Sequence, residues 1–162
     1  MRKLFVLGSF LALAAMSCNS SSDQDSEASD LPILNVSTQL SGANEVPSNS
    51  SDATGSVDGT FDPNTGVLDI TIMYNDSSTA DTNGTEGKKL FEPTAWHIHK
   101  APADSSGGVV FNLGSTFSSP FNFIDTLSTE QMQELKDGLY YVNIHTADHG
   151  AGEIRGQLNV AE

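Results

Sequence analysis

Short stretches in which apolar and polar residues alternate, each bounded by turn-forming residues, constrain the fold of this chain more than any other feature. The clearest stretch is 67–74, where one face of an extended strand would carry Leu68, Ile70, Ile72 and Tyr74. Weaker or shorter stretches occupy 34–40, 95–100, 109–113, 140–146 and 153–160. This pattern predicts β-strands that bury one face.

The connections between these stretches also favour β-structure. Between Phe61 and Val67, the segment Asp-Pro-Asn-Thr-Gly (62–66) is typical of a type I turn with a bulge and predicts a hairpin. The segment 76–92 is polar and contains glycine, so we expect a long mobile loop there.

One short helix is predicted near residue 130. Ser128 followed by Gln131 is typical of a capping box, and Gly138 can end the helix. Many short strands with a single helix predict an all-β fold, an antiparallel β-sandwich or barrel with one short helix.

The N-terminal residues have the features of an export signal. Arg2 and Lys3 precede an apolar run of about 12 residues, which suits a secretory signal and is too short to span a membrane as a helix. The sequence Ala-Met-Ser-Cys at 15–18 resembles the lipobox of bacterial lipoproteins, with alanine where leucine is usual. We therefore expect residues 1–17 to be a lipoprotein-type signal peptide and Cys18 to be lipidated. The alternative is ordinary cleavage that leaves Cys18 as a free thiol.

Residues 18–31 are predicted to be a disordered tether ahead of a folded domain at 32–162. The run 19–30 contains five serines, four acidic residues and no large apolar side chain. It resembles the surface-export signals of some bacterial lipoproteins, and a plain spacer is the alternative. The expected location is therefore the cell envelope, at the outer membrane and exposed on its surface, with the lipid on Cys18 as the membrane contact.

Charge and motif content exclude several functions. The chain has 7 basic and 21 acidic residues, a net charge of -14, so nucleic acid is not an expected partner. The folded domain has no cysteine for thiol chemistry and no Gly-x-Ser-x-Gly nucleophile elbow. A binding module is therefore favoured over an enzyme, and catalysis stays open.

Four histidines, His97, His99, His145 and His149, lie in two short segments. On an extended strand, His97 and His99 point to one face, and Trp96 and Ile98 to the other. In 140–146, Asn143 and His145 lie opposite the apolar face. If the two strands are neighbours, three imidazoles converge, and His149 in the following turn is a possible fourth ligand.

Three imidazoles on one face suit zinc or copper, and the absence of a thiol favours a nitrogen-rich site. The alternative is structural, with histidines that hydrogen-bond to loops or to each other. Both interpretations remain open at this point.

The last stretch contains a second polar group. Glu153, Arg155 and Gln157 alternate with apolar residues, and Arg155 is the only arginine after the signal peptide. We expect a partly buried pairing of Arg155 with Glu153 or an aspartate, a structural role. Binding of a ligand by Arg155 is the alternative.

Five motifs together resemble the CHRD domain, the module repeated in chordin and present in many exported bacterial proteins. They are Leu-Ser-Gly-Ala-Asn-Glu-Val-Pro (40–47), Ala-Trp-His-Ile-His (95–99), Gly-Gly-Val-Val (107–110), Gly-Leu-Tyr-Tyr-Val-Asn-Ile-His-Thr (138–146) and Gly-Glu-Ile-Arg-Gly-Gln-Leu (152–158). The resemblance implies an extracellular β-sandwich, and His97, His99, His145, Glu153 and Arg155 fall on its motif positions. His149 does not, which makes it the least supported metal ligand.

Residues 97–99 and 142–150 are also similar to the copper-ligand segments of copper/zinc superoxide dismutase. This similarity implies an immunoglobulin-like or superoxide-dismutase-like sandwich and copper as the metal. The disulfide cysteines, the zinc-site loop and the bridging histidine of that enzyme have no counterpart here.

The sequence thus predicts a lipid-anchored CHRD-domain binding module with one copper ion, or alternatively zinc, on His97, His99 and His145. Glu153, Arg155 and Asn143 are expected as structural residues or additional ligands. A metal-free module that binds a protein or glycan is the alternative function. A copper redox enzyme similar to superoxide dismutase is the third.

Overall fold

The computed structural model describes residues 30–75 and 91–162. The predicted signal peptide, Cys18, the tether up to residue 29 and nearly all of the predicted loop at 76–92 lie outside the described residues. Within the described ranges, no helix has both the length and the apolar character needed to cross a membrane.

Nine strands, one α-helix and one 3-10 helix make up the described fold. In chain order they are β1 (Leu34–Ser41), η1 (Gly42–Asn44), β2 (Thr54–Phe61), β3 (Val67–Tyr74), β4 (Pro93–Lys100), β5 (Gly108–Asn112), β6 (Phe121–Thr126), α1 (Thr129–Lys136), β7 (Tyr140–Thr146), β8 (Ile154–Gln157) and β9 (Asn159–Ala161). The strands form a sheet in the order β5-β4-β7-β8-β1-β2-β3-β6, and β9 pairs with β1. The strand pairs are antiparallel.

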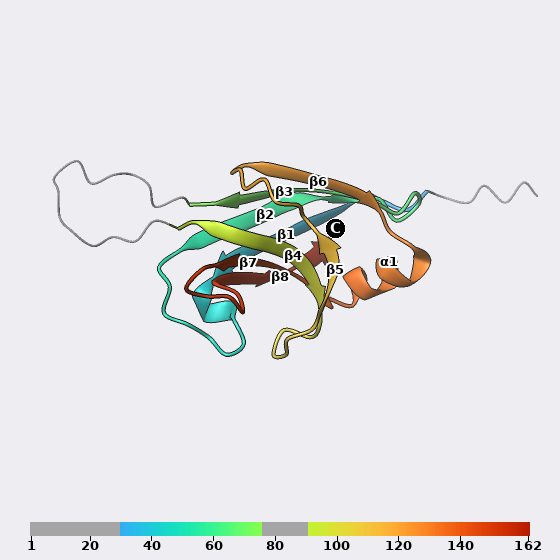
Figure 1. The fold of residues 1–162 in the computed structure, drawn as a ribbon. Helices are drawn as coiled ribbons and strands as arrows, with labels where there is room; N and C mark the ends of the chain where they lie inside the picture. The colour runs from blue at the N-terminus through green and yellow to red at the C-terminus, as the bar shows by residue number, and fades with distance from the viewer. Residues whose placement is uncertain (1–29, 76–90) are drawn as a thin grey trace, which may run out of the picture.

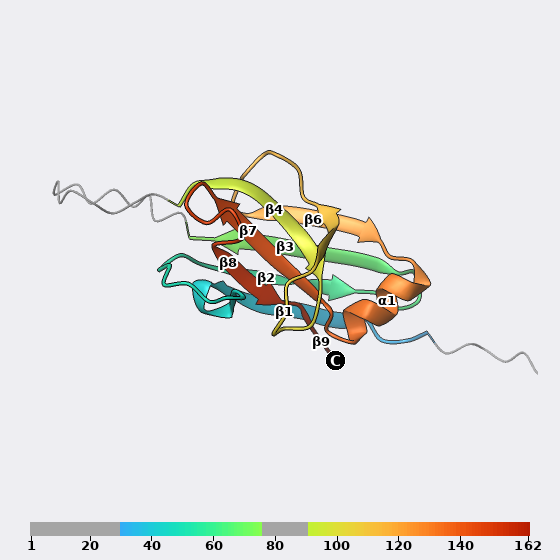
Figure 2. The same ribbon diagram turned by 60° about the horizontal axis from the view of Figure 1, so that its bottom comes forward.

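The sheet curls so that its two halves face each other (Figures 1 and 2). Strands β6, β3, β2 and β1 form one layer, and β4, β7 and β8 form the layer opposite. A right-handed twist that accumulates from strand to strand produces this kind of curl. The prediction of an all-β sandwich or barrel with one short helix is confirmed.

The hydrophobic core lies between the two layers. From β3, the alternating residues Leu68, Ile70 and Ile72 are completely buried. The layer opposite contributes Trp96, Ile98, Tyr140, Val142 and Ile144, which are also completely buried. Burial of a large apolar side chain contributes about 1.5–3 kcal/mol, so this core is the main force that holds the layers together.

The hairpin predicted at 62–66 is present between β2 and β3. The backbone N–H of Asp62 donates to the carbonyl of Val67 over 2.9 Å. Gly66 has a φ of 79°, a left-handed conformation that glycine adopts without strain. The turn therefore fixes the register of the two central strands of its layer.

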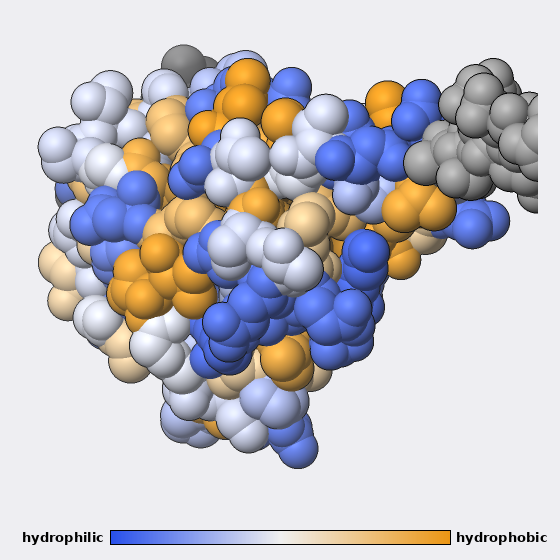
Figure 3. Space-filling model, turned by 90° about the vertical axis from the view of Figure 1, so that its right-hand side faces the viewer, coloured by the Kyte–Doolittle hydropathy of each residue, from blue (hydrophilic) through white to orange (hydrophobic). Residues whose placement is uncertain are grey.

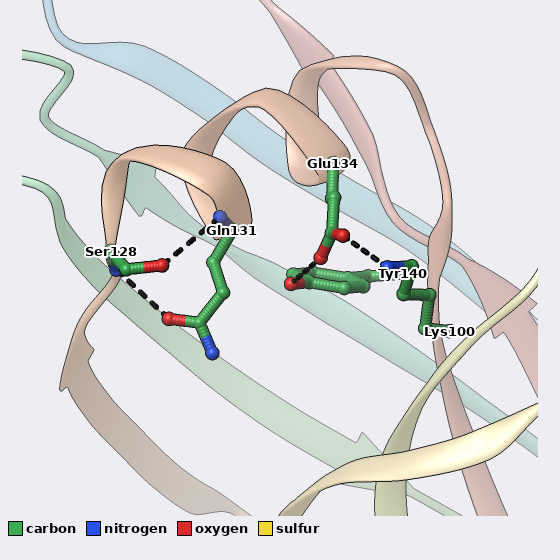
Figure 4. A network of polar contacts seen from close by, with 5 residues as sticks. All are labelled: Lys100, Ser128, Gln131, Glu134 and Tyr140. Atoms are coloured by element: carbon green, nitrogen blue, oxygen red, sulfur yellow. Dashed lines mark hydrogen bonds and ion pairs between the residues drawn. The ribbon is translucent and has the colours of Figure 1, made fainter.

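The capping box of α1 is also confirmed (Figure 4). The Ser128 hydroxyl accepts a hydrogen bond from the Gln131 N–H, and the Gln131 side chain accepts one from the Ser128 N–H. Leu135 points into the core with no exposed surface. The helix thus closes one end of the space between the layers.

Glu134 connects this helix to the layer of β4, β7 and β8, which is the lower layer in Figure 1 (Figure 4). Its carboxylate accepts a hydrogen bond from the Tyr140 hydroxyl over 2.6 Å and forms an ion pair with Lys100. Since Tyr140 begins β7 and Lys100 ends β4, one carboxylate holds the helix to the two strands that carry the histidines.

The structure corrects two sequence predictions of strands. The stretch 153–160 is two short strands, because the chain breaks at Leu158, whose N–H donates to the carbonyl of Tyr140. Strand β6 was not predicted. It is an edge strand in which Phe121 and Phe123 pack against the core and Ile124 on the opposite face is exposed, so apolar residues occur on both of its faces.

Strand β7 is buried over its whole length, on the polar face as well as the apolar one. The loop from β4 to β5 and the segment after β1 extend below the lower layer in Figure 1. Together with the β7–β8 turn, they lie over the outer face of this layer, since residues 45, 105, 107 and 150 hydrogen-bond to its polar side chains. The fold therefore contains a second, polar layer outside the hydrophobic core.

The end of the molecule that carries α1 has a mixed surface. Figure 3 shows hydrophobic side chains there in separate groups, interrupted by hydrophilic ones. Exposed large apolar residues of the described ranges include Leu31, Val109 and Ile124. Scattered exposure of this kind is normal for a folded domain and does not define a docking surface.

Candidate metal centre

Strands β4 and β7 are neighbours, as the convergence of the histidines requires. Across the pair, His97 lies opposite Asn143 and His145 lies opposite Ala95, so His97, His99 and His145 share the outer face. One ring nitrogen from each of the three histidines lies within 4.8 Å of the other two. The predicted convergence of three imidazoles is therefore present.

The Nδ1 of His97 and the Nε2 of His145 are 3.2 Å apart. Two imidazole nitrogens bound to one tetrahedral ion at 2.0–2.1 Å would be about 3.3 Å apart. This pair is thus already spaced as two ligands of one ion. Figure 1 shows the strands β4 and β7 that position them.

Backbone carbonyls determine which nitrogens are available. The Nδ1 of His99 lies 2.9 Å from the carbonyl of Gly107, and the Nδ1 of His145 lies 3.1 Å from the carbonyl of Gly150. A carbonyl oxygen only accepts, so each Nδ1 must carry the hydrogen and each neutral ring keeps its lone pair on Nε2. A metal-binding histidine typically donates its second nitrogen in this way.

The Nε2 of His99 is buried and has no hydrogen-bond partner. Native proteins leave few buried polar atoms unpaired, and each such atom calls for an explanation such as an ion. The unpaired lone pair of His99 is therefore the feature of this cluster that a purely structural role does not explain.

Burial also favours the neutral rings that a metal ion needs. Burial lowers the pKa of His97, and the proximity of His99 lowers it further. Burial likewise lowers the pKa of His145, although its hydrogen bond to Gly150 acts in the opposite direction. Because only the unprotonated nitrogen binds a cation, the environment prepares the rings for coordination near neutral pH.

His149 lies in the turn between β7 and β8, outside the three-histidine group. Its backbone N–H donates to the Thr146 hydroxyl, and its carbonyl accepts from Thr146 and Gly152. The structure therefore places His149 as a turn residue.

Arg155 is nearly completely buried in the polar layer, with 1% of its surface exposed. Its guanidinium donates to the carbonyls of Pro102 and Ser105 and to the Gln157 side chain. It also stacks on the ring of Tyr141, 3.5 Å from the centroid. Arg155 is thus held in the polar layer by partners other than the predicted ones.

The pairing of Arg155 with Glu153 is not found between these two described residues. The Glu153 carboxylate instead accepts hydrogen bonds from the hydroxyls of Ser51 and Thr146. The carboxylates whose charges favour the Arg155 cation are those of Glu45 and Asp104. Glu153 thus secures the start of β8 to the segment after β1.

Glu45 is a site residue that the sequence analysis did not identify. Burial raises its pKa to about 7, against the opposing effects of Arg155 and Asn143. Its Oε1 and the Oδ1 of Asn143 are both buried without a partner. With His99, three of the four unpaired buried side-chain atoms in the described ranges lie in this polar layer.

A pocket of about 440 Å³ opens beside the polar layer. Its lining includes Glu45, Arg155, Gln157, Asn44 and Asn159. These residues come from β8, the segment after β1 and the start of β9, and none of the three clustered histidines lines the pocket. The polar layer therefore has two parts, the histidine cluster and this pocket.

Comparisons with known proteins are consistent with these observations. The family model of the CHRD domain matches residues 36–158, a range that includes the three histidines, Glu45 and Arg155. A search of curated proteins and a search of solved structures each found no match. With the family model covering most of its length, this chain belongs to the CHRD-domain family.

Proposed function

We propose that this protein is an exported, lipid-anchored CHRD-domain binding module that holds one copper ion on His97, His99 and His145. The observation that carries the metal site is the pair of bonds from Nδ1 of His99 and His145 to backbone carbonyls. These bonds leave two Nε2 lone pairs for an ion beside His97.

The donor atoms favour copper and admit zinc. Imidazole suits both metals, and divalent copper binds nitrogen sites more tightly than zinc does. The described residues of the cluster offer three ligands, which leaves a coordination position for water or a small ligand. When bound, copper would supply a redox-active centre or an attachment point for such a ligand.

Metal content tests this proposal. The purified full-length protein is loaded with Cu²⁺ or Zn²⁺, desalted and submitted to elemental analysis. We expect one copper ion per chain, and loss of that ion in His97→Asn, His99→Asn and His145→Asn. His149→Asn is the matched control and should retain the metal, because His149 lies outside the cluster.

Each variant is also checked by circular dichroism, since a variant that does not fold carries no information about the ligand. Preferential retention of zinc would mean that zinc, the alternative metal, occupies the site in place of copper. Failure of the folded wild-type protein to retain either metal would refute the site.

The lipid anchor rests on the signal-like N-terminus and the similarity of residues 15–18 to a lipobox. Expression in a bacterial host, followed by mass spectrometry of the N-terminal peptide, tests it. We expect a diacylglycerol-modified Cys18 and recovery of the protein with membranes. Cys18→Ala should be unmodified, and an unmodified wild-type Cys18 would refute the anchor.

The pocket beside Arg155 favours a second candidate, a metal-free module that binds a protein or glycan. Its buried Glu45 and Arg155 and its volume of about 440 Å³ suit a small polar group of a larger ligand. Glycan and peptide arrays probed with wild-type protein and with Asn44→Ala test this function. Binding that is lost in Asn44→Ala but kept in His97→Asn would favour the pocket over the metal centre.

A further inference from the structure

Tyr141 lies between a proposed metal ligand and the buried arginine. Its ring is stacked on His99, with centroids 5.0 Å apart and planes 10° apart. The Arg155 guanidinium lies over the same ring, 3.5 Å from its centroid. Because β4 and β8 flank β7, the two contacts come from opposite sides and leave the ring little freedom to turn.

The Tyr141 hydroxyl reaches His99 by a second route. It accepts a hydrogen bond from the backbone N–H of Gly107 over 3.0 Å, and the carbonyl of Gly107 accepts the hydrogen of the His99 Nδ1. Tyr141 therefore contacts the His99 ring directly and also fixes the peptide segment that selects its tautomer.

The loop that carries Gly107 is packed too closely for a larger residue at this position. A Cβ on Gly107 would lie 1.8 Å from the carbonyl oxygen of Lys100. The guanidinium of Arg155 holds the same loop through Pro102 and Ser105. The Gly107 carbonyl is thus fixed from two sides, by Tyr141 and by Arg155.

We propose that Tyr141 is a positioning residue of the metal centre. It holds the His99 ring in the orientation and in the Nδ1–H tautomer that make Nε2 available to the ion. The tautomer of a histidine is determined by the hydrogen bond that its other nitrogen makes. Second-layer partners of this kind change metal affinity by about 10- to 100-fold when they are removed. The inference rests on the proposed metal site, but its tautomer part concerns the protein without metal.

The neighbouring tyrosine provides a matched control. Tyr140 is also completely buried on β7, but it points to the opposite face and donates its hydroxyl to Glu134. Tyr140→Phe therefore removes a buried hydroxyl from the same strand without touching the polar layer.

The first experiment records the ring nitrogens of the metal-free protein by long-range ¹H–¹⁵N NMR. We expect the Nδ1–H tautomer for His99 in the wild type and in Tyr140→Phe. In Tyr141→Phe, or in Tyr141→Leu which also removes the stacked ring, we expect a shift toward the Nε2–H tautomer. An unchanged His99 tautomer in both folded Tyr141 variants would overturn the positioning role.

The second experiment measures Cu²⁺ affinity and the electron paramagnetic resonance spectrum of bound copper. We expect Tyr141→Leu to weaken binding by about 10-fold or more and to change the copper hyperfine splitting, while Tyr140→Phe changes neither. Equal affinity and spectra in folded Tyr141→Leu would contradict the proposal. A wild-type protein that binds no metal would refute the metal centre, whereas the NMR result would still decide whether Tyr141 selects the tautomer.

Discussion

His97 and His145 contact each other across β4 and β7 through a single hydrogen, with Nδ1 and Nε2 3.2 Å apart. The two rings cannot both be protonated in this contact, because two protonated rings would repel at this distance. The pair therefore links the protonation of the polar layer to the stability of the sheet beneath it.

The contribution of His97 and His145 to the stability of the metal-free protein should fall as the pH is lowered below the ordinary histidine value of 6.5. The pKa values of His97 and His145 are lowered in the folded chain, so these two residues take up more protons in the unfolded chain in this range. Urea unfolding between pH 5 and pH 8, in the absence of metal, measures the effect.

The free energy of unfolding of the double variant His97→Asn/His145→Asn, relative to that of the wild type, should therefore rise as the pH is lowered over the same range. His149→Asn is the control and should behave as the wild type does. An identical pH dependence in the double variant would contradict this assignment of the titrating groups.

The contribution of Glu45 to stability should depend on pH in the opposite direction to that of the two histidines. Its pKa is raised from 4.5 to about 7 in the folded chain, so the carboxyl stabilises the fold when protonated, and this contribution is lost as the pH rises through about 7. Glu45→Gln should therefore gain stability relative to the wild type between pH 5 and pH 8, on the order of 1–3 kcal/mol. Denaturation at the two pH values checks this, and a difference that does not depend on pH would contradict it.

Gly152→Ala should be strongly destabilising. Gly152 has a φ of 133°, and a Cβ there would lie 2.4 Å from the Asn143 amide and 2.6 Å from the Glu45 carboxylate. Backbone strain and steric overlap together should cost about 2 kcal/mol or more. Gly150→Ala is the control, because nothing lies within 4 Å of its Cβ position, and equal thermal midpoints for the two variants would count against this packing.

Ser128→Ala should cost about 1 kcal/mol through loss of the N-cap of α1. The Ser128 hydroxyl accepts from the Gln131 N–H, and alanine leaves that donor without its protein partner. The thermal midpoint of Ser128→Ala is compared with that of Ser118→Ala, which replaces an exposed serine, and the difference isolates the effect of the cap. A loss no larger than that of the control would mean that the helix end does not depend on this bond.

Local patterns were sufficient to predict most of the strands and the shared face of the histidines. Because side chains alternate along a strand, the positions of His97, His99 and His145 in two β-stretches already determine which way they point. Alternation also identified the core residues of β3. It did not identify β6, where an edge position leaves Ile124 exposed.

The covering of the polar face could not be predicted, because it depends on loops from distant parts of the chain. Glu45 enters the polar layer from the segment after β1, and the carbonyls of Gly107 and Gly150 come from two other connections. No periodicity marks such residues. The same reason explains why Glu153 or an aspartate was predicted as the partner of Arg155, whereas its guanidinium donates to the carbonyls of Pro102 and Ser105 and to the Gln157 side chain.

The strand order has a consequence for how the histidine cluster forms. His97 and His145 are 48 residues apart, and β5, β6 and α1 lie between them in the chain. The cluster exists only after β4 has paired with β7. An ion that prefers the three-histidine cluster therefore binds the folded chain and not the unfolded one. Saturation at 100 times the dissociation constant would then add about 2.7 kcal/mol to the free energy of unfolding, which makes the folded population responsive to the supply of metal.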